Sequence, residues 1–402
     1  MEWKLKDLTV DGKGSYGIGA SAVPYQEDKL TYLRITDIND DGSLNFSDLK
    51  SVDAEDAEKY ILKENDIVFA RTGNSTGRSY FYEKHHGTFV YAGFLIKFSL
   101  DPNKVNPKIL KYYTHSKPYF DWVSSFDTGA TRGNINAKTY GDMEIELPSR
   151  KIQDRIVSIL SSLDRKIELN NKINADLEEM AQAIFKNWFV DFEPFKDGKF
   201  VNSELGMIPE GWKVGRLTDV IKLMPGGTPK TSEPLYWDNG TIPFFSPKDV
   251  SGLYCFETEK HITEAGLNKC SSNLYPKDTI FITCRGTVGK VCLTACNMAM
   301  NQSNYAIKAM DGYSQYYVYY LVKSVVERLI KKSNGAVFSA ITSKDFDEEI
   351  LIPSKKAVED FTNVIDGFFR RIVTIGSENS HLSLLRDTLL PRLMSGEIEV
   401  PE

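Results

Sequence analysis

Two long stretches of the chain carry apolar residues on alternating four- and three-residue steps, positions that we call the seam. From about Lys151 to Phe189 the seam consists of Ile156, Leu160, Leu163, Ile167, Leu177, Ala181, Ile184 and Trp188. From about Lys355 to Met394 it consists of Phe361, Ile365, Phe368, Ile372, Ile375, Leu382, Leu389 and Leu393. This spacing predicts two long helices that each bury a narrow stripe, as in a coiled coil. At about 1.5 Å per residue each helix is roughly 55–60 Å long.

Polar residues interrupt both seams. Asn170 and Asn174 do so in the first helix, and Asn379 and Arg386 do so in the second. A polar residue in a seam lowers stability but fixes which residues face each other. We therefore predict that the two helices pair antiparallel, with Asn170, Asn174 and Asn379 setting the register. The alternative is that each stripe packs on its own globular domain, but such a domain is only about 30 Å across and cannot cover either helix.

The remainder of the chain is built of short β-rich runs that are separated by Gly, Asn and Asp turns. Several phrases of this part occur twice, at a separation of roughly half the chain. Trp3–Leu8 recurs as Trp212–Leu217, Asp66–Phe69 as Asp278–Phe281, and Gly129–Lys138 as Gly335–Lys344. Each copy ends at a Pro-Ser step that opens one long helix.

These patterns predict an α+β protein with two mixed α/β globular domains and two long helices that pair as an antiparallel coiled coil with pseudo-two-fold symmetry. We place the first domain at residues 1–150, the central helix at 151–190, a linker at 191–211, the second domain at 212–354, and the C-terminal helix and tail at 355–402.

Composition narrows the function. Hydrophobic residues make up 41% and charged residues 26% of the 402 residues, which is typical of globular proteins. The net charge of −6 argues against a free-standing DNA binder covered in lysine, so any nucleic-acid binding must use local clusters or a partner. We find no apolar run of the length that a membrane span needs. The five cysteines all lie between Cys255 and Cys296, which indicates a reduced, cytoplasmic protein without a zinc site.

Catalytic motifs are missing from the sequence. We find no phosphate-binding loop, no zinc-hydrolase helix and no Gly-rich nucleotide fingerprint. The chain is therefore expected to have no catalytic residues and to bind no metal or cofactor itself.

Two pairs of loops carry the polar chemistry. The turns Arg71–Arg78 and Arg285–Lys290 are either hairpin loops with solvated charges or sites that present arginine to guanine or phosphate, with glycine permitting close approach. The loops 129–138 and 334–344 mix small, amide and basic residues, and they are open to the same two interpretations. The candidate DNA-binding residues are Arg71, Asn74, Thr76, Arg78, Arg132, Asn134, Asn136, Lys138, Arg285, Thr287, Lys290, Ser339 and Lys344.

Four further phrases, in this order, resemble the DNA-specificity subunit of type I restriction-modification enzymes. They are Leu147 to Asn171 around the start of the first helix, Ile184 to Pro194 at its close, Ser203 to Trp212, and Leu389 to Ile398. The resemblance covers essentially the whole chain.

The resemblance implies two target-recognition domains, 1–150 and 212–354, that each read one half of a bipartite double-stranded DNA site. It also implies that the paired helices fix the spacer and dock two methyltransferase subunits. Those partners would supply S-adenosylmethionine, and restriction subunits would supply ATP-driven translocation and cleavage with magnesium.

Two other classes of protein stay open at this point. One is a methyltransferase or nuclease fused to its own reader, although no span is left unassigned to house a cofactor. The other is a coiled-coil adaptor with two protein-binding domains and no sequence-specific DNA binding.

Overall fold

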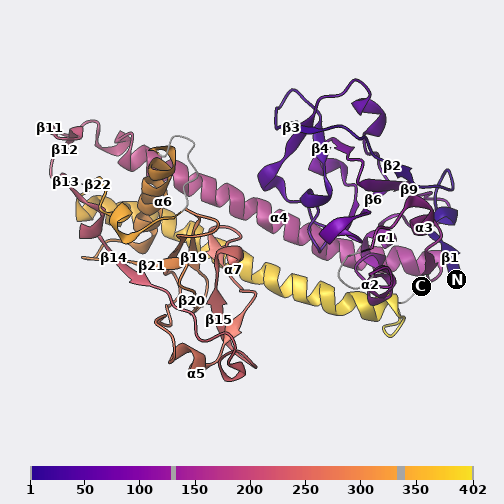
Figure 1. The fold of residues 1–402 in the computed structure, drawn as a ribbon. Helices are drawn as coiled ribbons and strands as arrows, with labels where there is room; N and C mark the ends of the chain where they lie inside the picture. Colours follow the sequence, from indigo (N-terminus) through magenta and orange to yellow (C-terminus); the bar gives the residue numbers. More distant parts are fainter. Residues whose placement is uncertain (1, 128–132, 333–339, 401–402) are drawn as a thin grey trace. The chain divides into compact units, whose positions relative to one another are not determined.

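A computed structural model describes residues 2–127, 133–332 and 340–400. The chain divides into two compact units (Figure 1). Unit 1 is Met1–Lys166 with Leu382–Glu402, and unit 2 is Ile167–His381. The two long helices are α4 (Arg150–Phe189) and α7 (Lys355–Met394), and each contributes residues to both units.

Unit 1 contains two four-stranded sheets. The central sheet has the order β2-β9-β6-β7, and the second has the order β3-β5-β4-β8. The strands of the central sheet are β2 (Ser15–Tyr16), β6 (Asp66–Ala70), β7 (Ser79–Phe81) and β9 (Leu95–Ser99). Those of the second are β3 (Ala22–Pro24), β4 (Thr31–Leu33), β5 (Lys50–Val52) and β8 (Phe89–Tyr91). A separate pair joins β1 (Glu2–Lys4) to β10 (Glu144–Glu146), so the first strand closes against the last.

Strand β6 is the centre of this unit, because both of its faces are buried. Ile67 and Phe69 pack into a core with the short helices α1 (Lys108–Tyr113), α2 (Lys117–Ser124) and α3 (Ala137–Gly141). Val68 and Ala70 point to the opposite face and pack with residues of the second sheet. The uninterrupted apolar run of this strand follows from that double burial.

Unit 2 contains a five-stranded sheet of order β14-β21-β18-β19-β16 and a three-stranded sheet of order β17-β15-β20. The larger sheet consists of β14 (Ile221–Pro225), β16 (Tyr254–Cys255), β18 (Ile280–Thr283), β19 (Val291–Thr294) and β21 (Asn304–Ala309). The smaller consists of β15 (Ile242–Phe245), β17 (His261–Ile262) and β20 (Ala299–Met300). The unit also has the pairs β11 (Phe200–Ser203) with β12 (Gly206–Pro209) and β13 (Lys213–Arg216) with β22 (Glu349–Ile352), and the helices α5 (Glu264–Leu267) and α6 (Gln315–Lys332).

The two units repeat one topology, which confirms the internal repeat read from the sequence. The order β2-β9-β6-β7 corresponds to β14-β21-β18-β19, and the pair β1-β10 corresponds to β13-β22. The second sheets also correspond, since β4 runs parallel to β8 just as β15 runs parallel to β20. The second-sheet correspondence has no recurring phrase in the sequence, so only the strand pairing shows it.

Within unit 2, α4 and α7 contact each other through the predicted register residues. The Asn170 Nδ2 donates to Asn379 Oδ1 at 2.8 Å and to Glu378 Oε2 at 2.9 Å, and the Asn379 Nδ2 donates to Asn171 Oδ1 at 2.7 Å. The Asn174 Nδ2 lies 3.5 Å from the carbonyl oxygen of Ile372. Residue numbers rise along one helix while they fall along the other, so the two segments are antiparallel in this unit.

The buried face of the helices is wider than the predicted seam. Phe185, Phe189 and Phe369 are buried in the core of unit 2, although all three lie outside the seam, whereas Trp188 and Phe368 are only partly buried. In unit 2, the segments of α4 and α7 pack on each other and on the larger sheet, and two neighbours require a wider apolar face than one partner does. A coiled coil along the whole length stays a prediction.

Within unit 1, a buried carboxylate joins α4 to α7 and α1. Asp164 lies 3.0 Å from the Lys111 Nζ and 3.2 Å from the Arg386 Nη1, and it accepts a hydrogen bond from the Tyr112 hydroxyl at 3.0 Å. Burial acts to raise the pKa of Asp164, but the two cations and the hydroxyl outweigh it, so the pKa is lowered. Arg386, which the sequence marks as an interruption of the seam, is thus the partner of a buried charge.

The substitution Asp164→Asn should loosen the attachment of residues 382–394 to unit 1. The amide removes the one carboxylate that Lys111 and Arg386 share, although each keeps a second carboxylate, Glu83 or Asp387, so we expect a cost of about 2 kcal/mol near neutral pH. Because the folded-state pKa of Asp164 is lowered, this stabilisation is full above about pH 4 and is lost as the pH falls through the folded-state pKa. Hydrogen–deuterium exchange of residues 382–394 measures the effect, with the strands of unit 2 as an internal reference.

Asp154→Asn is the matched control, since Asp154 forms an exposed pair with Arg150. Equal protection in Asp164→Asn and the native protein would contradict the role of the network.

Candidate nucleic-acid interface

The two basic turns share one backbone frame. In unit 1, the Ala70 amide donates to the Arg78 carbonyl at 2.8 Å, and the Gly77 amide donates to the Ala70 carbonyl at 3.0 Å. In unit 2, the Thr283 amide donates to the Lys290 carbonyl at 2.9 Å, and the Gly289 amide donates to the Thr283 carbonyl at 2.8 Å. Ala70 therefore corresponds to Thr283, and both turns end on a basic residue.

The glycines have the same two roles in both turns. Gly73 and Gly286 have φ of +70° and +79°, and a Cβ on either would meet open space. Gly77 and Gly289 have φ of +88° and +84°, but a Cβ there would lie 2.6 Å from Val123 of α2 or 2.8 Å from Ile330 of α6. The first glycine permits the turn, and the second lets the backbone lie directly on a helix.

The second loop of each copy lies against the first. The Ile135 amide donates to the Arg71 carbonyl at 3.0 Å, and the Ile341 amide donates to the Cys284 carbonyl, also at 3.0 Å. In unit 1 the Thr76 hydroxyl adds a hydrogen bond to the Gly133 carbonyl at 3.0 Å. The sequence proposes these loops separately, and the structure brings them together in each unit.

Arg71 is held by two neighbours in unit 1. Its guanidinium carbon lies 5.0 Å from the centroid of the Tyr16 ring, and its Nε donates to Asn134 Oδ1 at 3.5 Å. Asn134 is exposed and Arg71 is half-buried. Tyr16 is missing from the residues proposed from the sequence, because only the pairing of β2 with β9 brings it here.

The other proposed residues of the first turn differ in exposure. Asn74 is exposed. Thr76 is buried, and its hydroxyl donates to the carbonyls of Gly73 and Gly133. Arg78 is half-buried and forms an ion pair of 2.7 Å with the exposed Asp40. Thr76 therefore holds the turn together.

The second loop of unit 1 leads into α3. Asn136 is the N-cap of this helix and accepts a hydrogen bond from the Thr139 amide at 2.9 Å. Lys138 is exposed and pairs with Asp142 at 3.0 Å. Arg132 and Ser339 lie outside the described residues.

In unit 2, four proposed residues are exposed: Arg285, Thr287, Lys290 and Lys344. The first arginines of the two turns do not correspond. The residue in the frame position of Arg71 is Cys284, which is buried, and Arg285 follows it. The turn of unit 2 is one residue shorter than that of unit 1. Its first arginine, Arg285, therefore lies at a different position of the shared backbone frame from Arg71.

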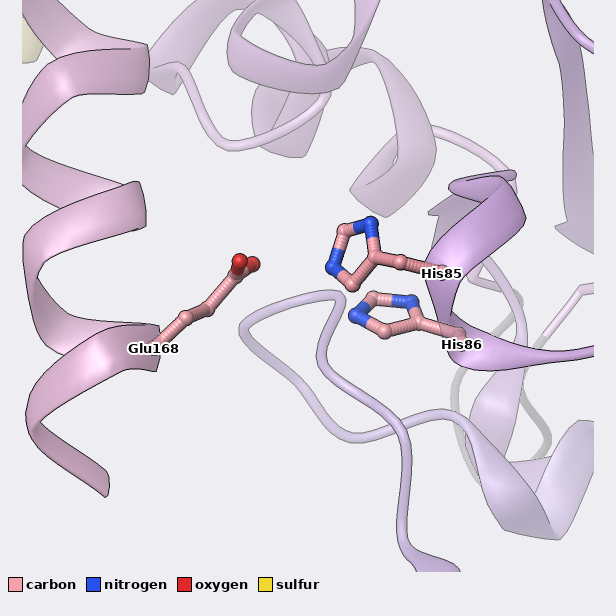
Figure 2. Close-up of side chains that lie close together, drawn as sticks. All are labelled: His85, His86 and Glu168. Atoms are coloured by element: carbon pink, nitrogen blue, oxygen red, sulfur yellow. The ribbon is translucent and has the colours of Figure 1, made fainter. Parts of the chain in front are cut away.

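Two histidines of unit 1 stand next to each other on the 3-10 helix η6 (Lys84–His86), as Figure 2 shows. Their ring centroids are 4.3 Å apart, and the His86 Nδ1 lies 3.0 Å from the Tyr80 hydroxyl. Glu168, the third residue in Figure 2, is part of α4 in unit 2. Two imidazoles alone are fewer ligands than a zinc site uses, so we assign no metal to them.

Three of the five cysteines, Cys255, Cys284 and Cys292, are buried core residues. All five are free, and burial raises the pKa of the Cys255 and Cys284 thiols to about 12. A thiol with such a pKa is protonated and unreactive at neutral pH.

Among the described residues, no helix is long and apolar enough to cross a membrane.

Two similar units, each with a pair of adjoining polar and basic loops, define a protein with two related binding domains. The sequence profile of the family described as "Type I restriction modification DNA specificity domain" matches residues 6–179 and 209–373. These matches span most of the chain, and the protein belongs to this family.

Its relatives share both sequence and fold. The type I restriction enzyme MjaIX specificity subunit of Methanocaldococcus jannaschii is 30% identical over 300 residues, which cover 73% of this chain and 69% of that protein. The HindI specificity subunit of Haemophilus influenzae is 26% identical over 406 residues, which cover 85% and 88% of the two chains. The crystal structure of an S subunit from M. genitalium matches all of this chain and 96% of its own, with a TM-score of 0.57 at 16% identity, and so has the same fold.

The two glycines of the first turn should differ in their tolerance of alanine. Gly73→Ala adds only the strain of a left-handed residue, about 1 kcal/mol. Gly77→Ala adds the same strain and a clash with Val123, so we expect a loss of about 2 kcal/mol or more. Urea unfolding of both variants, compared with the native chain, measures the difference. Equal destabilisation would show that the contact with α2 is unimportant.

Proposed function

We propose that each unit of this specificity-family protein reads one half of a bipartite double-stranded DNA site. The observation that supports this most strongly is the repeated loop frame, which carries different side chains in the two units. Arg71 in unit 1 corresponds to Cys284 in unit 2, although the backbone hydrogen bonds around them are the same. A constant frame with variable side chains suits the recognition of two different sequences.

The loop residues divide by role in this proposal. Arg71 and Asn134 would contact base edges, because arginine suits guanine and asparagine suits adenine. Arg78 forms an ion pair with the exposed Asp40, and the exposed Lys138 forms one with the half-buried Asp142. Ion pairs that water reaches are weak, so both cations can exchange their carboxylates for DNA phosphates. Thr76 would position the turn without touching DNA, since its hydroxyl is used internally.

Six further residues complete the proposed DNA-binding set, two from unit 1 and four from unit 2. Cationic groups at the loops can contact phosphates or guanine, and the amide and hydroxyl groups can contact either bases or backbone. These residues are Asn74, Asn136, Arg285, Thr287, Lys290 and Lys344.

The net charge of −6 favours action within a larger assembly, because an acidic protein binds DNA weakly alone.

In unit 2, one side of α4 exposes the apolar residues Leu169, Ile173 and Met180, at 53%, 40% and 50% of their surfaces. Apolar residues three, four and seven positions apart share one side of a helix. We assign this side to the docking of methyltransferase subunits, which would bring S-adenosylmethionine, while restriction subunits would bring ATP and magnesium. This chain then needs no catalytic residue.

Replacing residues 1–148 with the corresponding part of a related subunit should change one half of the methylated sequence and leave the other half intact. The exchange keeps Ile156, Leu160 and Leu390, which complete the core of unit 1. Methylome sequencing of cells that carry the hybrid and its methyltransferase partner measures the outcome. The reciprocal exchange of residues 213–352 is the control and should change only the other half. A change in both halves would refute separate readers.

We further propose that α4 and α7 set the spacer between the half-sites. One heptad inserted after Ile167 and another after Leu382 keep Asn170 opposite Asn379, because both insertions lie on the same side of this pair. Seven residues add roughly 10 Å of helix, or about three base pairs. The methylated motif should gain a spacer of that size, with reduced affinity because one half-site is rotated. An insertion after Ile167 alone is the control and should abolish activity. An active double variant with the original spacer would contradict the proposal.

A further inference from the structure

Three residues of unit 1, Tyr16, Arg71 and Phe94, lie at one end of the central sheet. In the antiparallel pair β6–β9, Ala70 stands opposite Leu95, and the Arg71 amide donates to the Phe94 carbonyl at 3.1 Å. Arg71 and Phe94 therefore lie side by side, each one residue beyond the end of its strand. Strand β2 places Tyr16 opposite Ile96, two residues beyond Phe94, and the Tyr16 ring lies against the Arg71 guanidinium.

Phe94 is the exposed member of an otherwise buried segment. Its side chain is 58% exposed, while Leu95 and Ile96 beside it are fully buried. The Tyr16 ring is 42% exposed and lies against the Arg71 guanidinium, and its hydroxyl accepts a hydrogen bond from the Ala137 amide at 3.1 Å. The cation is thus held between an aromatic ring and Asn134, and the exposed Phe94 is hydrogen-bonded to Arg71 through its backbone carbonyl. A large apolar side chain fixed in water beside a positioned cation indicates a contact surface.

The same frame in unit 2 carries different chemistry. There the Cys284 amide donates to the Ser303 carbonyl at 2.8 Å, and β14 places Pro225 opposite Tyr305. Ser303 thus corresponds to Phe94, Cys284 to Arg71, and Pro225 to Tyr16. The two aromatic rings and the arginine are peculiar to unit 1, although the backbone that holds them is common to both units.

We propose that Phe94 is a specificity-determining residue that packs on the C5 methyl group of a thymine in the half-site of unit 1, next to the base contacted by Arg71. The proposal rests on the function proposed above. In the major groove, the thymine methyl is the only apolar group that a base edge presents, and phenylalanine is among the side chains that contact it. Tyr16 is a positioning residue, because its ring lies against the guanidinium and its hydroxyl is hydrogen-bonded to the Ala137 amide.

Deoxyuridine tests the contact, because it lacks only the C5 methyl group of thymidine. The native chain is assembled with its methyltransferase partner, and its methylated motif is determined. Duplexes in which each thymine of the unit 1 half-site is replaced singly by uracil are then compared by competition binding. One replacement should weaken binding by the native complex about fourfold, the ratio that burial of one methyl group gives. The same replacement should leave the binding of a Phe94→Ala complex unchanged.

Two further variants make the result specific. Phe94→Leu keeps an apolar side chain and should still distinguish thymine from uracil. Phe46→Ala removes another exposed phenylalanine of unit 1, 51% exposed, and should distinguish the two bases as the native protein does. The inference is overturned if no thymine of that half-site shows the effect, if the half-site contains no A·T pair, or if Phe94→Ala retains the native preference.

Failure of this inference can be told apart from failure of the proposed function. If the exchange of residues 1–148 changes one half-site and the uracil series shows no effect, unit 1 reads DNA without Phe94. If the exchange changes neither half-site, unit 1 does not read DNA, and both proposals fall.

Discussion

The core of each unit is completed by helix residues that are distant in the sequence from its sheets. In unit 1, Leu390 and Leu393 of α7 lie in the same apolar cluster as Ile156 and Leu160 of α4 and the residues of the central sheet. In unit 2, Phe185 of α4 and residues of α7 such as Phe361 and Ile365 join the cluster of the larger sheet. Burial of this kind stabilises each side chain by about 1.5–3 kcal/mol. Unit 1 is therefore made of two separate stretches of the sequence, whereas unit 2 is one continuous stretch that contains parts of both long helices.

The polar contacts between the helices act on this apolar framework. Asn170 with Asn379 in unit 2, and Asp164 with Arg386 in unit 1, are pairs that only one alignment of α4 and α7 satisfies within each unit. A shifted alignment would leave a buried amide or carboxylate without its partner, and such groups are costly when they are unpaired. The apolar residues supply the stability, and these pairs select the alignment.

At the loops, too, one set of groups holds the structure while another set is free to differ between the units. Backbone hydrogen bonds close both turns in the same way, and the glycines at 77 and 289 hold both against a helix. Because the frame uses main-chain groups and glycine, the side chains at positions such as 71 and 94 can vary without disturbing it. This property lets two copies of one fold carry different recognition chemistry.

The sequence by itself determined the two long helices, the repeat, the polar interruptions at Asn170 and Asn379, and the family resemblance. These features are local, since helix and strand periodicities and turn residues act within a few positions. The tertiary structure decided the rest. Strand pairing placed Tyr16 and Phe94 beside Arg71, made Cys284 the counterpart of Arg71, and turned the Thr76 hydroxyl inward. It also widened the buried face of the helices beyond the seam, to include Phe185 and Phe369. These outcomes depend on hydrogen bonds and contacts between residues far apart in the chain, which no periodicity of the sequence encodes.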